Sequence, residues 1–469
     1  MSESANRKTA ASSRGQMANS GNGPSFVPVD IGHDTYMGLL AADTAFWSLV
    51  KKDQLANVLS NGSSLMLEYR DKQRTFAKEM ETLRFGLTPS AVYFNPTERC
   101  NLNCSYCYIP TDMRRSGAHM GTKQLLDALD RLRTYLGQYV PAGRRPQVIF
   151  HGAEPMLNRE AVFKGIEAFG NDFSFGIQTN ATLLDDSAIS FLRDHKVGIG
   201  LSLDGHEASI TDETRKSWSN EGGVHDKVLW AIEKLNGYER FNVICTATTK
   251  NMHVLPQIVE LLHQMNVETC MLNPVRCTLP GAREVKPADH ELSTYYLSAL
   301  EKSVELYEKT GRKLVVANFA NILLGIIAPA ARRLMCDISP CGGGRCFFAV
   351  APNGDLFPCS EFIGLPHFRG GNLFADDIDD VLKSAPFKMV SERNVDTITP
   401  CNTCALRHFC GSPCPAEAHE MNGGMDAPGA FCELYEHQVR FALRLIADNR
   451  HEAFLFDNWD KDAQTIFQV

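Results

Sequence analysis

The chain has 469 residues, a formal net charge of −8 and a pI near 6.0, so it is long enough for two or three domains. The acidic balance argues against nucleic acid or an anionic membrane as the main partner. No apolar run approaches the length of a membrane-spanning helix, and a composition of 44% hydrophobic and 22% charged residues is typical of a globular protein.

The 15 cysteines are distributed unevenly, because most lie before residue 110 or after residue 335. A chain of this size without a secretory signal does not depend on disulfides, so clustered cysteines indicate metal ligands in a reducing cytoplasm. Three others, Cys245, Cys270 and Cys277, lie on or after predicted strands, and we expect them to be buried thiols.

The chain begins with residues 1–25, which are rich in Ser, Asn, Gly and Ala and are typical of a disordered tail. Residues 26–89 predict a helical segment. The main signal is an apolar pattern from Phe46 to Leu59 that suits an amphipathic helix. We expect this segment either to pack on the core or to form a small peptide-recognition region.

Residues 90–290 alternate apolar runs with helical patterns. Such βα units predict an α/β fold with parallel strands covered by helices, either an open doubly wound sheet or a partial barrel. In both folds, ligands bind at the carboxyl ends of the strands. The predicted strands are 91–94, 147–151, 174–179, 198–203, 242–248 and 269–272, and the helical runs between them are 123–139, 158–169, 185–194, 223–235 and 255–264.

The remaining chain changes character twice. Residues 291–335 predict connecting helices, and residues 336–435 are rich in Cys, Gly and Pro, which is typical of a small domain held together by metal. Residues 436–469 return to a helix followed by a tail.

The first cysteine loop contains Cys100, Cys104 and Cys107 and directly follows the strand at 91–94. Three thiolates within eight residues can hold one face of an iron–sulfur cluster. No fourth cysteine is near, and three protein ligands with an open position favour chemistry over a purely structural role. A zinc or structural iron–sulfur knuckle is the alternative.

Polar residues and glycines follow the next three predicted strands. Gly152 lets the backbone approach a ligand closely, and the Glu154 carboxylate can receive an ammonium group. Short polar side chains at the two following strand ends can contact a sugar or a carboxylate. These candidates for ligand binding are Gly152, Ala153, Glu154, Gln178, Asn180, Ser202 and Asp204.

The cysteine loop and these strand ends resemble the radical S-adenosylmethionine (SAM) superfamily. The resemblance implies a partial (β/α)6 barrel and a [4Fe–4S] cluster on which SAM fills the open position. Residues 151–155 are similar to the family's Gly-Gly-Glu-Pro motif, with Ala153 in place of the second glycine. The family also places Arg215 near the SAM carboxylate. Tyr106 could shield the cluster, flank the adenine or simply pack in the core.

The second cysteine set resembles the SPASM extension of that superfamily, which carries two auxiliary [4Fe–4S] clusters. The resemblance implies two sets of four ligands, with closed sites that suit electron transfer. Cys336 lies five residues before Cys341 and could displace it as a ligand. The implied sets are Cys341, Cys346, Cys359 and Cys414 for the first cluster, and Cys401, Cys404, Cys410 and Cys432 for the second. A pair of zinc knuckles is the alternative.

Members with this extension mostly modify peptides or protein side chains. Sulfatase maturases have an aspartate after the cysteine of the Gly-x4-Cys element, whereas here Cys359 is followed by Ser360 and Glu361. This difference favours peptide maturases, in which a radical removes a substrate hydrogen and an auxiliary cluster accepts an electron. Glu361 could take a proton, although an exposed loop carboxylate is the plainer interpretation.

The resemblance thus implies a precursor peptide or protein as substrate, and a reducing donor such as flavodoxin or ferredoxin. Three alternatives remain open at this point. The enzyme could form formylglycine, or act on a small molecule. The chain could also be a non-catalytic metal-binding or electron-carrying protein.

Overall fold

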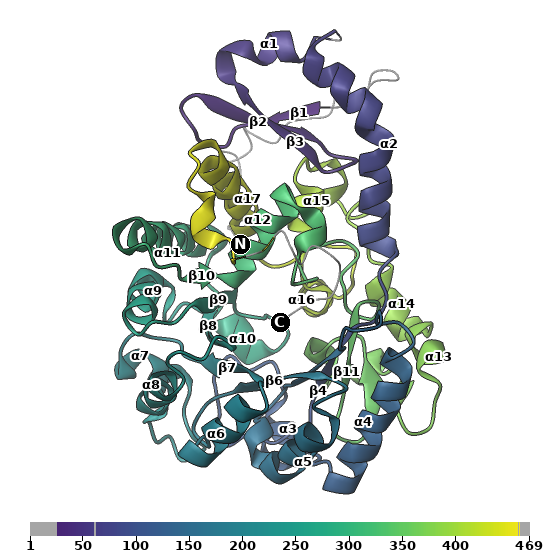
Figure 1. The fold of residues 1–469 in the computed structure, drawn as a ribbon, viewed down its shortest axis with the longest axis vertical. Helices are drawn as coiled ribbons and strands as arrows, with labels where there is room; N and C mark the ends of the chain where they lie inside the picture. Colours follow the sequence, from purple (N-terminus) through teal and green to yellow (C-terminus); the bar gives the residue numbers. More distant parts are fainter. Residues whose placement is uncertain (1–25, 61, 458, 460–469) are drawn as a thin grey trace, which may run out of the picture.

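The computed structural model describes residues 26–60, 62–457 and 459. The predicted tail at 1–25 and the last ten residues lie outside this part of the chain. Most of the described chain surrounds one large sheet, and a small second sheet lies at one end (Figure 1).

Six parallel strands form the centre of the ten-stranded main sheet, and their order in the sheet follows their order in the chain. Each is joined to the next through at least one helix, as parallel pairing requires. This arrangement confirms the predicted α/β fold and all six predicted strands. The strands are β4 (Ala91–Phe94), β5 (Gln147–Phe150), β6 (Ser174–Thr179), β7 (Gly198–Ser202), β8 (Phe241–Ala247) and β9 (Thr269–Pro274).

Amphipathic helices cover the outer face of these strands (Figure 1). Outward-facing residues such as Phe94, Phe150 and Ile177 are almost fully buried beneath them. Gly165 lets two helices approach, because a Cβ there would lie 2.9 Å from the Leu129 side chain. The helices are α4 (Thr122–Leu136), α5 (Arg159–Phe169), α6 (Asp186–Asp194), α8 (Val224–Lys234), α9 (Leu255–Gln264) and α11 (Asp289–Thr310).

The inner face of the strands is less tightly filled. Alternate residues point inward, and Gly176 and Gly200 leave room between the strands and α12 (Ala317–Ile327). A cavity of about 270 Å³ extends from the amino ends of the strands as far as Gln178. The barrel interior therefore reaches the carboxyl edge, where a ligand would bind.

The cysteine-rich part of the chain continues the main sheet. β11 (Phe347–Val350) pairs in parallel with β4, and β12 (Asp355–Phe357) and β13 (Gly371–Asn372) extend the sheet beyond it. On the opposite edge, β10 (Val315–Val316) pairs with β9. The remaining helices of this half are α13 (Ile378–Leu382), α14 (Ala385–Ser391), α15 (Arg407–Cys410), α16 (Pro415–Asn422) and α17 (Cys432–Ala447).

Besides one long helix described below, four further α-helices lie elsewhere in the described chain. They are α1 (Leu55–Val58), α3 (Thr111–Ser116), α7 (Ala208–Thr214) and α10 (Pro280–Glu284). Of these, α3 matters most for the site, because it directly follows the first cysteine loop.

The prediction of a helical segment at 26–89 is wrong for residues 26–51 and agrees with the structure for residues 64–85. Residues 26–51 form an antiparallel sheet of β1 (Phe26–Val29), β2 (Tyr36–Ala41) and β3 (Phe46–Lys51), followed by the long helix α2 (Ser64–Phe85). The sheet carries apolar residues on both faces, which hides the alternation typical of a strand.

Contacts on the two faces of β3 show why both are apolar. Phe46 packs on Tyr69 of α2, with ring centroids 4.9 Å apart. The Trp47 indole nitrogen donates a hydrogen bond to the Ile326 carbonyl of α12 at 2.7 Å. The small sheet is therefore enclosed between α2 and the main body.

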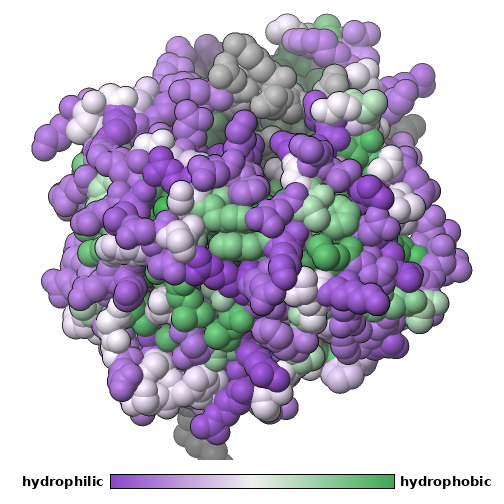
Figure 2. Space-filling model, turned by 60° about the horizontal axis from the view of Figure 1, so that its bottom comes forward, coloured by the Kyte–Doolittle hydropathy of each residue, from purple (hydrophilic) through white to green (hydrophobic). Residues whose placement is uncertain are grey.

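The outer surface is mostly hydrophilic, with separate apolar areas between charged side chains on the face shown in Figure 2. In the described chain, no helix has both the length and the hydrophobicity that crossing a bilayer requires. Two large exposed apolar residues, Leu67 and Phe85, lie on α2.

We predict that Leu129→Ala lowers the stability of the barrel by about 2–5 kcal/mol, because the fully buried side chain fills the contact between α4 and α5. Urea unfolding of the anaerobic protein measures this change. Leu67→Ala is the control, since that side chain is 54% exposed and should change stability by less than about 0.5 kcal/mol. Equal effects of the two substitutions would contradict the packing described here.

Candidate active site

The first cysteine loop lies at the carboxyl end of β4, as predicted. Cys100 and Cys104 are partly exposed, and burial raises the pKa of the Cys104 thiol to about 12. Burial also raises the pKa of Cys107, a rise that the Arg114 guanidinium opposes. The loop backbone is held from outside, because the Trp218 indole donates to the Cys100 carbonyl at 2.8 Å.

A buried ion pair fixes the middle of this loop. The Asp204 carboxylate, at the end of β7 and 0% exposed, accepts a hydrogen bond from Nε of Arg215 at 2.7 Å. The Tyr106 hydroxyl, between two of the cysteines, donates to the same carboxylate. Backbone and hydroxyl donors of Thr246 and Thr214 complete the set. Asp204 therefore connects the cysteine loop to the barrel.

These contacts decide three predicted roles. Asp204, a candidate for ligand binding, directs its carboxylate to Tyr106 and Arg215 and so braces the loop. The Arg215 guanidinium is turned toward Asp204, with its carbon 5.5 Å from the Tyr106 ring centroid. Tyr106 is buried and hydrogen-bonded to Asp204, which favours packing over a place beside the adenine.

The segment after β5 forms a second wall. Gly152 has φ +101°, and a Cβ there would lie 2.2 Å from the Asn95 side chain, so only glycine fits. The Glu154 carboxylate is fully buried and accepts from Met156 N, Thr179 Oγ1 and Asn180 N at 2.8–3.0 Å.

The three hydrogen bonds of the Glu154 carboxylate hold the turn. An ionised carboxylate has about four acceptor positions, so the expectation that it receives an ammonium group stays a prediction. The backbone from Gly152 to Ala153 also remains open to a ligand.

The remaining predicted SAM contacts divide into two kinds. Asn180 braces the cysteine loop, because its amide donates to Asn101 Oδ1 at 3.0 Å. Gln178 and Ser202 lie on the inner face of their strands. Gln178 hydrogen-bonds His151, and burial lowers the pKa of that imidazole to about 4. No hydrogen bond of the Ser202 hydroxyl is found in the described chain, so this side chain can serve a ligand.

The second cysteine set lies beside the first loop because β11 pairs with β4. Gly343 contacts two cysteines of this set. The Gly343 amide donates a hydrogen bond to Cys341 Sγ at 3.4 Å, and a Cβ atom added to Gly343 would lie 3.6 Å from Cys359 Cβ. Met335, next to Cys336, accepts from Gly342 N at 2.8 Å. Cys336, Cys341 and Cys359 therefore converge.

Cys414 begins α16 and shares the nearby cation Arg276 with Cys336 and Cys341. A separate group forms around Cys410. Burial raises the pKa of that thiol, and the neighbouring cysteines that raise it further are Cys432, Cys404 and Cys401.

Cys346 lies near Cys341: burial raises the pKa of the Cys346 thiol, and Cys341 raises it further. Cys346 directly precedes β11, is 0% exposed, and belongs by strand alternation with Phe348 and Val350 on the outer face. Tyr93, which pairs with Ala349 on the inner face, is near Cys336, Cys359 and Cys341 instead. By strand alternation Cys346 therefore faces away from Tyr93 and the thiols near it, although Cys341 remains its neighbour.

Glu361 is not the exposed loop carboxylate that the plainer interpretation expected. Its side chain is partly buried, and its Oε2 atom is buried without a hydrogen-bond partner in the described chain. Burial raises the pKa of Glu361 to about 7, and the Arg276 guanidinium opposes this rise. Its charge acts on both Cys107 and Cys359, so Glu361 lies between the two cysteine sets.

The donor chemistry fits iron–sulfur clusters. All 15 cysteines are free thiols, and burial is the main cause of the raised pKa values of those in the two sets for which a shift is resolved. Such crowded thiols are costly unless a metal centre binds them as thiolates. Three of these thiols follow β4, and the others of the two sets lie before and after β11 in the chain.

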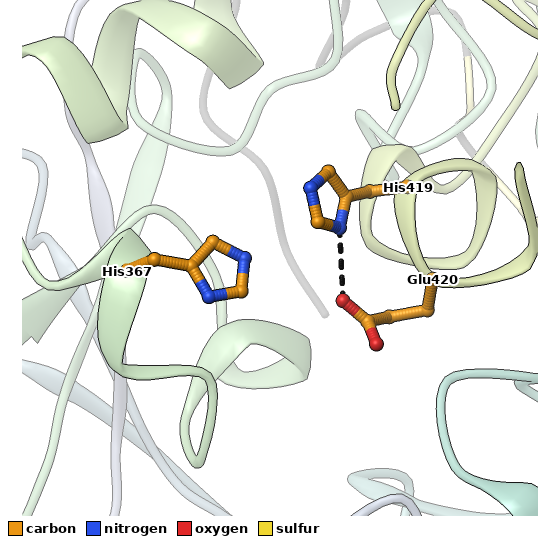
Figure 3. Close-up of side chains that lie close together, drawn as sticks. All are labelled: His367, His419 and Glu420. Carbon is orange, nitrogen blue, oxygen red and sulfur yellow. Dashed lines mark hydrogen bonds and ion pairs between the residues drawn. The ribbon is translucent and has the colours of Figure 1, made fainter. Parts of the chain in front are cut away.

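A separate group of His367, His419 and Glu420 has ligand-type atoms within 4.8 Å of one another (Figure 3). His419 Nδ1 lies 2.8 Å from a Glu420 oxygen, and the His419 ring packs on Phe368 at 5.0 Å. These contacts explain the arrangement without a metal ion. We assign no metal to this group.

Two family models match the chain. The radical SAM superfamily model covers residues 94–262, and the SPASM iron–sulfur cluster-binding domain model covers residues 341–405. The chain belongs to the radical SAM superfamily and carries a SPASM domain. A SAM-binding [4Fe–4S] cluster and auxiliary clusters are its cofactors, as the resemblance implied.

Curated relatives extend this assignment to nearly the whole chain. An uncharacterized protein of Archaeoglobus fulgidus is 37% identical over 87% of this chain and 92% of its own length. The PqqA peptide cyclase of Rhodopseudomonas palustris is 25% identical over 75% of this chain and 88% of its own length. A cysteine-type anaerobic sulfatase-maturating enzyme of Clostridium novyi is 23% identical over 72% and 91%.

Solved structures share the fold of this radical SAM protein. The structure titled anSMEcpe with bound AdoMet has a TM-score of 0.68 at 19% identity and covers 80% of this chain and 97% of its own. Streptococcus suis SuiB bound to precursor peptide SuiA has a TM-score of 0.54 at 13% identity, covering 85% and 98%. These likenesses confirm the partial barrel with a cysteine-rich C-terminal region.

Sequence reasoning missed several residues at the site of this radical SAM protein. Arg276 follows β9 and faces the second cysteine set, and Tyr108 contacts His151 at 3.3 Å. The position of Arg276, a basic residue shortly after a predicted strand, could have indicated that it lies at the site. Asn95, which forces a glycine at position 152, had no such signal.

We predict that Asp204→Asn destabilises the protein by about 3–5 kcal/mol and reduces its iron content, because it leaves the buried Arg215 charge unpaired. Thermal unfolding and iron analysis of the anaerobic protein measure both effects. Asp186→Asn is the control: its ion pair with Lys234 is exposed and should contribute about 0–1 kcal/mol. A wild-type melting temperature for Asp204→Asn would contradict this role.

Proposed function

We propose that this protein is a radical SAM peptide maturase that oxidatively modifies or crosslinks a side chain of a ribosomally made peptide. The observation that carries the proposal is the Glu361 carboxylate, which lies between the two cysteine sets and whose Oε2 atom is buried without a hydrogen-bond partner in the described chain. A base at that place suits removal of a proton from a substrate held between the clusters. The peptide cyclase and sulfatase-maturating relatives support the substrate class.

The cofactors supply the difficult steps: SAM on the first cluster provides the radical that removes a hydrogen atom, and an auxiliary cluster accepts one electron. The chain's own residues hold and orient the reactants. We assign Cys100, Cys104 and Cys107 to the first cluster. The backbone at Gly152 and Ala153, with Gln178 and Ser202, is proposed to contact SAM, while Asp204, Arg215, Tyr106, Glu154 and Asn180 hold that site in shape.

Glu361 is assigned the role of general base. Its carboxyl group has a pKa of about 7, so about half is ionised near neutral pH. Ser360 cannot replace it, because its buried hydroxyl hydrogen-bonds toward Tyr108 and Cys359. Overall the substrate loses one hydrogen atom, one proton and one electron, which is a two-electron oxidation.

We revise the ligand set of the first auxiliary cluster. The proposed ligands are Cys336, Cys341, Cys359 and Cys414. Cys336 thus replaces Cys346 in the set, whereas the sequence had suggested that it could replace Cys341. The supporting observations are the convergence of three of these thiols and the outer-face position of Cys346. Cys401, Cys404, Cys410 and Cys432 are proposed to hold the second cluster.

The N-terminal sheet is proposed to recognise the peptide. No further strand pairs with β1 or β3 in the described residues, so each presents an open edge to which an extended peptide can add. A reducing donor such as flavodoxin or ferredoxin is proposed to supply the electron for SAM cleavage.

The test is mass spectrometry of a candidate precursor peptide co-expressed anaerobically with this protein. We expect a peptide lighter by two hydrogen atoms per crosslink, and no change with the Cys100→Ala, Cys104→Ala, Cys107→Ala variant. Formylglycine formation would instead replace a cysteine sulfur by oxygen. An unmodified peptide together with normal SAM cleavage would overturn the peptide proposal and favour a small-molecule substrate.

We predict that the rate of peptide modification rises about tenfold per pH unit below pH 7 and levels off above it, because only ionised Glu361 accepts a proton. Glu361→Gln should remove this rise and lower the rate about 10²–10⁴-fold. Single-turnover assays across pH measure both. Glu420→Gln is the matched control, and an unchanged pH profile in Glu361→Gln would exclude Glu361 as the base.

We predict that Cys336→Ala and Cys346→Ala differ in iron content. Three four-iron clusters hold about twelve irons. Cys336→Ala should fall toward about eight, whereas Cys346→Ala should remain near the wild-type value. Iron and sulfide analysis after anaerobic reconstitution measures this, with Cys341→Ala as the positive control. Loss of iron only in Cys346→Ala would restore the original ligand set.

A further inference from the structure

Arg393 is a buried cation whose hydrogen bonds all go to neutral oxygens. Arg393 is only 8% exposed and lies in the loop after α14. The guanidinium donates to the Ser412 carbonyl at 2.7 Å and hydroxyl at 3.0 Å, to the Ala427 carbonyl at 2.7 Å and to the Met425 carbonyl at 3.0 Å. These bonds fix its position.

The segments that bind Arg393 carry ligands of both proposed auxiliary clusters. Ser412 lies midway between Cys410 and Cys414, which are assigned to different clusters. On its other side, the Arg393 carbonyl accepts a hydrogen bond from the Ser339 hydroxyl at 3.4 Å. Ser339 lies between Cys336 and Cys341. The residue therefore connects both cysteine groups.

No carboxylate pairs with Arg393 within 4.0 Å in the described chain, so the compensating negative charge must come from elsewhere. Burial lowers the pKa of Arg393, and four thiols oppose that effect: Cys341, Cys401, Cys414 and Cys410. Two of these belong to each proposed cluster. An unpaired buried cation is otherwise costly, so thiolate-bound clusters are the partners that its site fits.

We propose that Arg393 is a positioning residue whose guanidinium provides the positive charge shared by the two auxiliary clusters and raises the reduction potential of both. The physical reason is that reduction adds negative charge to a cluster. A fixed cation in a site of low dielectric constant stabilises the reduced form. The inference rests on the ligand sets proposed above.

The test is an EPR-monitored redox titration of the full-length chain carrying Cys100→Ala, Cys104→Ala and Cys107→Ala, so that only the auxiliary clusters contribute. Arg393→Gln should lower both midpoint potentials, each by at least a tenfold change in the reduction equilibrium, which is about 59 mV for a one-electron couple. Arg393→Lys keeps the charge and should retain most of both potentials.

Arg444→Gln is the matched control. Arg444 is also partly buried and donates to the Ile31 carbonyl at 2.6 Å, but the charged groups near it are carboxylates and another arginine rather than cysteines. This substitution should leave both midpoints unchanged.

Two outcomes would overturn the proposal. The first is an Arg393→Gln variant with full auxiliary iron and unchanged midpoints, or with only one midpoint shifted. The second is an equal loss of iron in Arg393→Gln and Arg393→Lys. That result would show that the hydrogen bonds of Arg393 are needed for cluster assembly and that its charge is not the cause. The proposal requires that Arg393→Lys keeps its iron. The ligand sets are tested by the iron content of the Cys336→Ala and Cys346→Ala variants. An error in those sets is therefore distinguished from an error in the role of Arg393.

Discussion

The ion pair between Asp204 and Arg215 is the interaction on which the site depends. The carboxylate is completely buried, and it is stable there only because five donors from four residues surround it. One of these donors, Tyr106, lies inside the first cysteine loop. The end of β7 thereby sets the position of thiols that precede it by about a hundred residues in the chain.

The pairing of β11 with β4 is the second constraint. It brings the cysteine-rich part of the chain beside the first loop, although the two strands are more than 250 residues apart in sequence. The loop after β12 then carries Cys359 and Glu361 to the space between the two cysteine sets. One oxygen of the Glu361 carboxylate is buried there without a hydrogen-bond partner in the described residues, which suits a group that acts on a substrate.

Electrostatics connects these features. Cys414 interacts with both Arg276 and Arg393, and Arg276 also interacts with the Glu361 carboxylate, whose pKa is raised. Such a concentration of titratable groups is unstable in an empty protein interior and becomes favourable when anionic clusters balance the cations. In the proposed arrangement the arginines supply the positive charge that balances the clusters, as the cysteines supply the ligands.

The sequence by itself determined the six βα units, because each strand is an apolar run and each helix has the period of an amphipathic helix. It also determined the three thiols of the first loop and the second group around Cys410, because close spacing in the chain forces closeness in space. Neither conclusion needed long-range information.

Only the tertiary structure decided the rest. Residues 26–51 form strands because both their faces are covered, which hides the alternation that identifies a strand. Cys346 and Cys336 are similarly spaced from Cys341, and the alternation of β11 separates them. Glu361 is partly buried, and the charged groups that act on its pKa, Arg276 and Glu417, lie far from it in the chain. In each case the deciding contact joins residues far apart in the chain, and local pattern contains no record of such contacts.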